Sequence, residues 1–330
     1  MKTMKRRTVI HAGLAGALLH ASQTRAQGLR KVTIGLAGQS MIAAIPRFSK
    51  EMGLFEKRGI DITFVTMDSA NAAAAALIGG SVDYAFSGPV ELIAARSRGR
   101  ELVAIANTYG GLGGSLVLAK SVADKLGVAP NAPVADRLKA LKGLTLASPS
   151  PTSAYTVSYK AAATAVGSEP KFTFMAMPAM QAAMESGAIQ GYVASAPFWV
   201  LPLVSGSATL WISGPGADLP ANLRPRSNSV LLTTRAIANA NPDLVKSIVG
   251  VFTDFAEAVD KRPADVKAAV AKVFPNVDAR TLEVLFESES KAWKAKPLTP
   301  ADIVHEIAYS KASGISLQVD GVDPASMLWP

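Results

Sequence analysis

The chain has 330 residues, of which 49% are hydrophobic and 18% are charged, so it can fold into two domains that each have a core. Its formal net charge is +9, but the first 26 residues hold five basic residues and no acidic ones. The rest therefore carries +4 without a dense basic run, which argues against nucleic-acid binding. Cysteine is absent, which excludes cysteine nucleophiles and cysteine-ligated zinc.

Histidine is nearly as scarce as cysteine. His305 is the single histidine beyond residue 26, which excludes a two-histidine metal site, and a Ser-His-Asp triad would have to use it. Because His305 lies in an amphipathic helical pattern near the C-terminus, we expect a surface or half-buried structural histidine. We therefore predict no catalytic residues, no cofactor and no metal.

The first 26 residues have the pattern of an export signal. A basic segment that includes Arg6 and Arg7 precedes thirteen mostly apolar residues (9–21), and residues 24–26 form a small-x-Ala cleavage site. Thirteen residues are too few to span a bilayer. We predict cleavage near Ala26 and a periplasmic mature protein that begins at Gln27. The two arginines also fit a twin-arginine signal, and the sequence leaves open whether that route or general secretion is used.

Strand and helix patterns alternate along the mature chain, which predicts parallel strands with helical crossovers. Strands are predicted at 31–37, 60–66, 82–86, 102–108, 115–119, 144–147, 171–177, 189–194 and 230–233. Helices are predicted at 46–50, 71–78, 90–98, 134–142, 154–166, 180–185, 244–260, 263–274, 279–293 and 300–312. Residues 211–227 contain proline, glycine and few periodic positions, so we expect an irregular segment there.

One arrangement occurs twice. In residues 80–89 a short buried strand ends in Ser87-Gly88, and Pro89 takes the first position of a helix. In residues 180–198 a helix, a strand and a turn with Pro197 follow in the same order. A strand that ends at a helix N-terminus offers free backbone N–H groups to a ligand. We expect the two units to face each other across a cleft.

Two further segments bear on this cleft. The hydroxyl-rich turn 148–154 enters a helix for which Thr152 or Ser153 is a suitable N-cap. The glycine cluster 109–114 is interpreted as a crossing between domains, and the strand near 230 as the return; an ordinary flexible glycine loop is the alternative.

Four motifs in chain order carry a family resemblance. Residues 53–62 are similar to G-x-F-x-x-x-G-L-x-V, 80–85 to G-x-x-D-x-A and 141–147 to L-K-G-K-x-I-A, and 241–245 match the start of a C-terminal helix. With these motifs the chain resembles the substrate-binding proteins of nitrate/sulfonate/taurine-type ABC importers, which have a type II periplasmic-binding-protein fold.

The chain departs from that family in two places. Gln190 stands where the family usually has an aspartate, and we interpret this change as structural. Ser195-Ala196-Pro197 replaces the family's W-E-P turn, which removes a carboxylate and an aromatic ring from the expected rim of the cleft. The ligand therefore need not be one of the family's best-known ones.

The resemblance implies an α/β fold with two lobes, each a mixed sheet flanked by helices, joined by two crossing segments. Lobe 1 would comprise residues 27–115 and 227–330, and lobe 2 residues 116–226. The implied ligand contacts lie at strand ends and helix starts facing the cleft. They are Gln39, Ser40, Met41, Ser87, Gly88, Thr108, Tyr109, Ser150, Thr152, Ser153, Pro197, Phe198 and Asn228. For each of them the alternative is a residue that only caps a helix or forms a turn.

The implied function is capture of a small polar or anionic organic solute, sulfonate-like or carboxylate-like, by hinge closure, and its delivery to an inner-membrane ABC permease with a cytoplasmic ATPase. The protein is expected to be a monomer. Arg224 and Arg226, near the return crossing, could clamp an anion, although a solvated basic loop is the simpler interpretation. Tyr155, Phe198 and Trp199 could pack an apolar part of the solute or belong to the core.

Two alternatives belong to other classes. A periplasmic ligand-sensing receptor without transport would have the same sequence features. An enzyme on the same fold is disfavoured because the resembling enzymes of pyrimidine synthesis are cytoplasmic and carry a cysteine-rich motif, whereas this chain has no cysteine and an export signal. The chain also lacks G-x-S-x-G, P-loop and G-x-G-x-x-G patterns.

Overall fold

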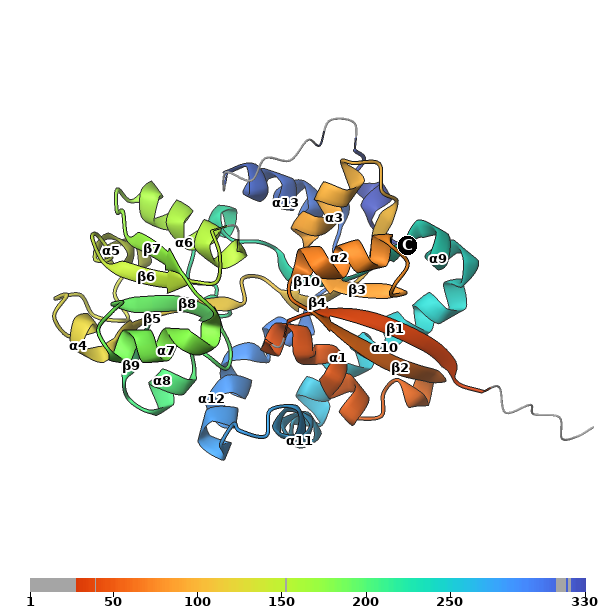
Figure 1. The fold of residues 1–330 in the computed structure, drawn as a ribbon, viewed down its shortest axis with the longest axis horizontal. Coiled ribbons are helices and arrows are strands. Elements are labelled where there is room, and N and C mark those ends of the chain that lie inside the picture. Colours follow the sequence, from red (N-terminus) through yellow and green to blue (C-terminus); the bar gives the residue numbers. More distant parts are fainter. Residues whose placement is uncertain (1–27, 39, 152, 313–318, 320–321) are drawn as a thin grey trace, which may run out of the picture.

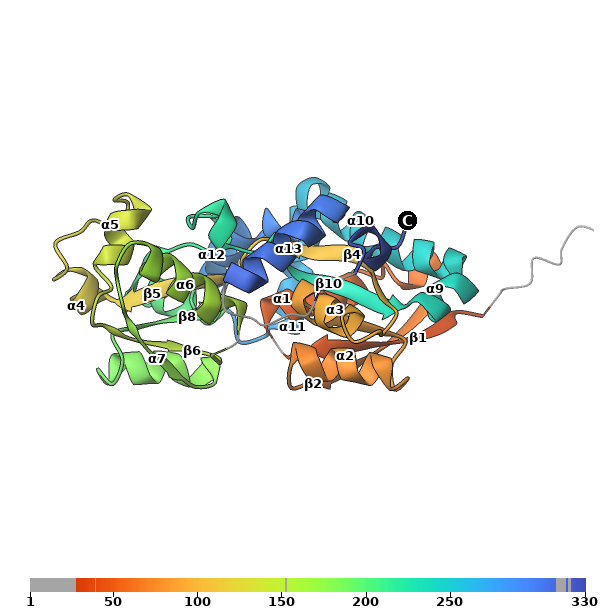
Figure 2. The same cartoon turned by 90° about the horizontal axis from the view of Figure 1, so that it is seen from above.

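The computed structural model describes residues 28–38, 40–151, 153–312, 319 and 322–330. The predicted export signal, Gln39 and Thr152 lie outside the described residues. Two lobes lie side by side, each built on a five-stranded sheet with helices packed against it (Figures 1 and 2). We call them the first lobe and the second lobe after the order in which their sheets begin.

The sheet of the first lobe has the strand order β2-β1-β3-β10-β4. Its strands are β1 (Arg30–Ala37), β2 (Ile60–Met67), β3 (Tyr84–Ser87), β4 (Leu102–Gly110) and β10 (Ser227–Thr234). β1 is parallel to β2 and β3, whereas β10 is antiparallel to both β3 and β4. The strand that returns from the second lobe is thus inserted between two strands of the first.

The sheet of the second lobe repeats this pattern with the order β7-β6-β8-β5-β9. Its strands are β5 (Gly114–Ala119), β6 (Thr145–Ser148), β7 (Lys171–Phe174), β8 (Gly191–Ser195) and β9 (Ala208–Ile212). β6 is parallel to β7 and β8, and β5, the strand that arrives from the first lobe, is antiparallel to β8 and β9. The predicted α/β fold with two mixed sheets and two crossings is confirmed.

The helices cover both sheets (Figure 1). They are α1 (Met41–Glu51), α2 (Ala70–Ile78), α3 (Pro89–Arg96), α4 (Lys120–Ala123), α5 (Val134–Lys139), α6 (Ala154–Ala165), α7 (Met177–Glu185), α8 (Leu201–Val204), α9 (Arg235–Ala240), α10 (Pro242–Lys261), α11 (Pro263–Val273), α12 (Ala279–Glu289) and α13 (Pro300–Ala312). Short 3-10 turns are η1 (Glu56–Arg58), η2 (Ala221–Leu223), η3 (Ala292–Lys294) and η4 (Ala325–Met327).

The prediction that the first helix begins at Pro46 is wrong, because α1 begins at Met41 and holds Pro46 in its interior. Proline there removes one intrahelical hydrogen bond. Burial of the apolar face outweighs this loss, since Ile42, Ile45 and Phe48 are all buried. The helix N-terminus therefore lies directly after β1.

The repeated unit predicted from the sequence has a structural counterpart in each lobe. Before β3, the Thr33 N–H donates to Asp83 Oδ2 at 2.8 Å and the Asp83 N–H donates to the Thr33 carbonyl at 3.0 Å. Before β8, the Thr145 N–H donates to Gln190 Oε1 at 2.8 Å and the Gln190 N–H donates to the Thr145 carbonyl at 2.9 Å. Gln190 supplies the same acceptor as Asp83, so its structural interpretation is confirmed.

The two crossing segments, residues 111–113 and 213–226, contact each other closely. A Cβ added to Gly214 would lie 2.1 Å from the Gly114 carbonyl oxygen and 2.7 Å from that of Leu112. A Cβ on Gly113 would lie 2.2 Å from Ile42 Cδ1, and one on Gly114 would lie 2.5 Å from the Tyr155 ring. Glycine is required in this region because backbone and side chains approach too closely for any Cβ.

We expect Gly214→Ala to lower the free energy of unfolding by about 1–3 kcal/mol, because the new methyl group would overlap rigid backbone carbonyls. Urea denaturation of the purified variant measures the change. Gly28→Ala is the matched control, since a Cβ there meets nothing within 4 Å. Equal stability of the Gly214→Ala variant and the control would contradict the close contact between the crossing segments.

Candidate ligand-binding site

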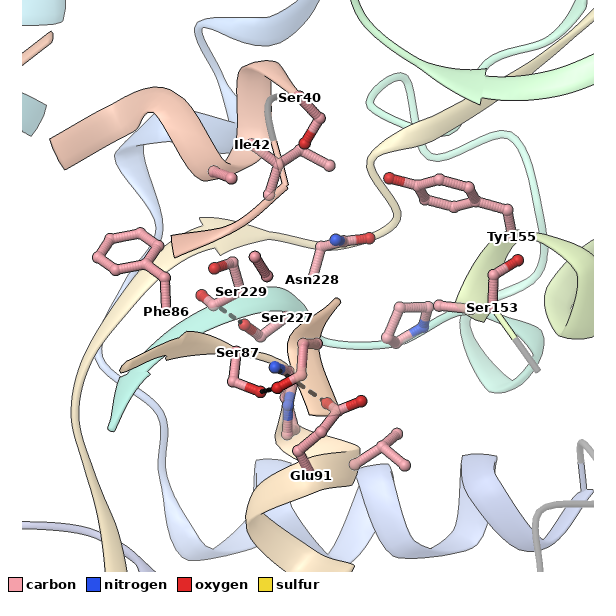
Figure 3. Close-up of a pocket in the computed structure, with 18 of the residues that line it drawn as sticks. Ser40, Ile42, Phe86, Ser87, Glu91, Ser153, Tyr155, Ser227, Asn228 and Ser229 are labelled. Carbon is pink, nitrogen blue, oxygen red and sulfur yellow. Dashed lines mark hydrogen bonds between the residues drawn. The ribbon is translucent and has the colours of Figure 1, made fainter. Parts of the chain in front are cut away.

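A cavity of about 290 Å³ lies between the two lobes and is lined by residues from both (Figure 3). The first lobe contributes side chains from the start of α1, the β3–α3 turn, β10 and α13. The second lobe contributes residues from the turn before α6, from α6 itself and from the start of α7. The cavity has the position expected for a ligand site in an open α/β fold, at strand ends and helix starts.

Three helices begin at the cavity wall. Ser40 is the N-cap residue of α1, Gly88 that of α3, and Ser153 that of α6, where the Ser153 hydroxyl accepts from the Thr156 N–H at 3.2 Å. Each helix follows a strand of its sheet, as the sequence predicts for α3 and α6. The partial positive charge of these N-termini and the nearby hydroxyl groups favour a hydrogen-bond acceptor or an anionic group.

The return strand β10 places three polar residues at the cavity, Ser227, Asn228 and Ser229 (Figure 3). The pairing of β10 with β4 is irregular at these positions. Asn228 Oδ1 accepts from the Gly113 N–H at 3.1 Å, so this side chain links the two crossing segments while it lines the cavity. On the opposite wall, burial raises the pKa of Tyr155, which therefore stays a neutral hydroxyl.

Two carboxyl groups also line the cavity, the half-buried Glu91 on α3 and the fully buried Glu306 on α13. Glu91 Oε2 accepts from the Gly88 N–H at 3.0 Å, and burial raises the pKa of Glu91. Glu306 Oε1 accepts from the backbone N–H groups of Arg226 and Ser227, and burial raises the pKa of Glu306 to about 7. Glu306 Oε2 has no hydrogen-bond partner among the described residues.

Neither glutamate was predicted from the sequence as a site residue, although each has a recognisable signal. Glu91 is the third residue of a helix that starts at Pro89, which is the position of the carboxylate in a capping box. Glu306 lies three residues after Ile303 and three before Tyr309, on the buried face of α13. An acidic residue on an apolar helix face indicates either a structural bond or a ligand contact.

No lysine, arginine or histidine is among the described residues that line the cavity. Arg224 and Arg226 line a separate pocket beside the crossing segments. Arg226 Nε lies 4.0 Å from Asp302, with 45% of its side chain exposed. The structure thus places neither arginine at the central cavity.

The structure brings five of the predicted contacts together at the cavity, namely Ser40, Ser87, Gly88, Ser153 and Asn228. Pro197 and Phe198 line a wider pocket of about 660 Å³, which shares Ala37, Ser40 and Met177 with the cavity. We call it the outer pocket, and Arg47 and Asp68 also line it.

The other predicted contacts that the structure describes are not among the residues that line the cavity. Met41 is buried, and its N–H donates to the Ala196 carbonyl of the second lobe at 3.1 Å. Ser150 does not line the cavity, and its carbonyl accepts from the Ser153 and Thr156 hydroxyls. Gln39 and Thr152 lie outside the described residues.

Thr108 and Tyr109 are inside β4, because this strand continues to Gly110 instead of ending at residue 108 as predicted. The Thr108 hydroxyl donates to the Ser229 carbonyl at 2.9 Å, and Thr108 lines a different cavity, of about 610 Å³, beside α10. Tyr109 is fully buried and its hydroxyl donates to Glu289.

Glu289 links the two lobes. It accepts from the Tyr109 hydroxyl of β4 and, at 3.3 Å, from Trp199 Nε1, which follows β8. Burial raises the pKa of Glu289 to about 7, and both hydrogen bonds act in the opposite direction. Trp199 is thereby identified as a core residue.

His305 is half-buried, and its Nε2 bonds the Arg224 carbonyl at 3.0 Å. The predicted structural role of this histidine is confirmed. In the described part of the chain, no group of three or more His, Cys, Asp or Glu side chains could hold a metal ion. The helices described there include none that is both long and apolar enough to cross a membrane.

Comparison with solved structures identifies the fold. The alkanesulfonate-binding protein SsuA from Xanthomonas axonopodis pv. citri, bound to MOPS, has a TM-score of 0.66 at 19% identity, over 92% of this chain and 99% of that one. The periplasmic aliphatic sulphonate-binding protein SsuA from Escherichia coli has 0.63 at 19%, over 88% and 96%. The ligand-binding component of an ABC-type import system from Staphylococcus aureus, with zinc bound, has 0.64 at 15%, over 91% and 97%.

The two lobes, the inserted strands and these similarities define a periplasmic-binding-protein fold of type II. The sequence profile of the NMT1-like family matches residues 25–275, so the chain belongs to this family. No curated protein matches the chain in sequence.

The buried carboxyl groups Glu289 and Glu306 give a testable pH dependence. Their pKa rises on folding from 4.5 to about 7, so the folded state holds their protons more tightly than the unfolded state. Their stabilisation is therefore complete below pH 4.5 and is lost as the pH rises to about 7. As the pH rises over this range, the free energy of unfolding of each Glu→Gln variant should increase relative to that of wild type by on the order of 2–3 kcal/mol. Urea denaturation measures this change. A difference that does not change with pH would contradict the raised pKa values.

Proposed function

We propose that the protein is the solute-binding component of an ABC importer and captures a small polar organic solute in the cavity between its lobes. The observation that carries this proposal is the cavity itself, which has three helix N-termini and several hydroxyl groups from both lobes on its walls. The two relatives named SsuA bind sulfonates, and their shared fold supports a related role here.

The mechanism follows from the connection between the lobes. The first lobe and the second lobe would rotate about the two crossing segments, residues 111–113 and 213–226. A solute that contacts both lobes stabilises the closed form by its additional contacts in that form. The closed form would dock on a permease that works with an ATPase. The N-terminal pattern supports a periplasmic location, and a monomer is sufficient for this mechanism.

The pocket chemistry narrows the solute. Helix N-termini and hydroxyls favour a sulfonate-like or carboxylate-like group, and Ile42, Phe86 and Tyr155 provide apolar contact. A cavity of about 290 Å³ suits a small molecule, and Arg47 adds a positive charge in the outer pocket, which shares three residues with the cavity. Among the described residues that line the cavity, none forms a nucleophile–base pair, so we propose binding without catalysis.

A thermal-shift screen of mature protein (Gln27 to Pro330) against sulfonates, nitrate, carboxylates and pyrimidines tests the proposal. A solute at one hundred times its dissociation constant should stabilise the protein by about 2.7 kcal/mol. Ala70→Trp should abolish the shift because Ala70 lines the cavity, whereas Ala75→Trp, on the exposed face of the same helix, should preserve it. Absence of any hit with folded protein would overturn the proposed function.

Transport and sensing are separated by a further measurement. Cells that lack the protein should lose uptake of the compound that gives the thermal shift, if the protein delivers it to a permease. Unchanged uptake, together with a lost response to the compound, would favour the sensing receptor instead.

A further inference from the structure

We propose that Glu306 determines specificity, selecting solutes that present an N–H or O–H donor, with Oε2 as the acceptor for that donor. The proposal rests on the proposed solute-binding function and names the part of the solute that the cavity recognises. It follows from three observations. Hydrogen bonds fix one oxygen of this carboxyl group, Oε1, and the other, Oε2, has no hydrogen-bond partner among the described residues. The described residues that line the cavity include no basic side chain that could be a partner for Oε2.

The carboxyl group is fixed in place by the return crossing. Glu306 is fully buried, and Oε1 accepts from two consecutive backbone N–H groups, those of Arg226 and Ser227. Two neighbours on α13 hold the helix at both sides. His305 bonds the Arg224 carbonyl, and the Tyr309 hydroxyl bonds the Ser158 hydroxyl at 2.7 Å and the Ala154 carbonyl at 3.2 Å in the second lobe. Glu306 is therefore held with Oε1 on the return crossing, and Oε2 stays buried in a residue that lines the cavity.

Burying a hydrogen-bond acceptor without a partner costs desolvation free energy, and burying a charged acceptor costs more. Because Oε1 is occupied, Oε2 is the atom left for a solute. Arg226 and Asp302 are the charged groups whose fields act on this carboxyl, in opposite directions, and burial outweighs both. Glu91, across the cavity wall on α3, adds a second carboxyl rather than a countercharge. A donor on the solute, cationic or neutral, removes the cost.

The remaining walls complete the description of the solute. The N-termini of α1, α3 and α6 can donate hydrogen bonds to an acceptor or anionic group at one end of the solute. A small organic acid that also carries an amino or hydroxyl group would satisfy both parts of the cavity. A simple inorganic anion, or an organic acid with an apolar remainder, would leave Oε2 without a partner.

Matched pairs of compounds test this inference by isothermal titration calorimetry of mature protein at about pH 8, where a group with a pKa of about 7 is mostly ionised. The pairs are 2-aminoethanesulfonate with ethanesulfonate, and 3-aminopropanoate with propanoate. Each screen hit is likewise compared with its analogue that lacks the donor. We expect the donor-bearing member to bind about 10-fold to 100-fold more tightly, as for a hydrogen bond to a charged group.

Glu306→Gln should reduce this preference at least about 10-fold. Its amide oxygen can still accept from Arg226 and Ser227, while its NH₂ group faces the solute as a donor. Glu289→Gln is the matched control, because Glu289 is also a buried glutamate with a raised pKa but does not line the cavity. The control should keep the wild-type preference.

Equal binding of the two members of a pair by wild type would overturn the proposal, and so would an unchanged preference in folded Glu306→Gln. The wild-type comparison is decisive even if the variant fails to fold. Binding without preference would leave the solute-binding function standing. Absence of binding by every compound in the screen and the pairs would overturn both.

Discussion

The two crossing segments touch along their backbones, and the geometry of the cavity depends on this contact. Gly214 lies against the Gly114 carbonyl so closely that no Cβ fits between them, and Asn228 accepts from the Gly113 N–H. Because the segments have no side chains there, Ile42 of the first lobe and Tyr155 of the second can pack against them and still reach the cavity. Gly113, Gly114 and Gly214 are therefore needed for space, whereas Gly111 has open space around it and a φ of +73°, a backbone conformation that favours glycine.

Ionisable groups secure this junction at two points. Glu289 joins β4 to the segment after β8, and Glu306 holds the return crossing through Arg226 and Ser227. Burial is unfavourable for the charged form of both groups, and the hydrogen bonds that they accept offset part of that cost. With a pKa of about 7 in each case, the charge at the junction changes near neutral pH, well above the range in which an unperturbed glutamate titrates.

Local patterns predicted most strands and helix starts, and the family resemblance implied the two-lobed arrangement. The departure from the family pattern at Gln190 predicted a structural replacement, and the hydroxyl-rich turn predicted Thr152 or Ser153 as an N-cap, of which Ser153 takes that position. Pro46 misled the prediction because tertiary burial outweighs its lost hydrogen bond. For Glu306, the spacing indicates a position on the buried face of α13 but not what the carboxyl group contacts. Its role depends on α13 meeting residues about 80 positions earlier in the chain, which no local pattern reveals.

The cavity is more polar on one side than on the other, and the repeated units explain why. In the first lobe the unit ends in Ser87, Gly88 and Glu91, which line the cavity. In the second lobe the Ala196 carbonyl accepts from the Met41 N–H of α1, so this turn contacts the other lobe instead of a solute. Among the described residues, the second lobe contributes Pro149, Ala154 and Met177 to the cavity wall, together with the hydroxyl-bearing side chains of Ser153 and Tyr155. In the proposed mechanism, hydrogen bonds to the first lobe would thus select the solute, and closure of the second lobe would add mostly apolar contact.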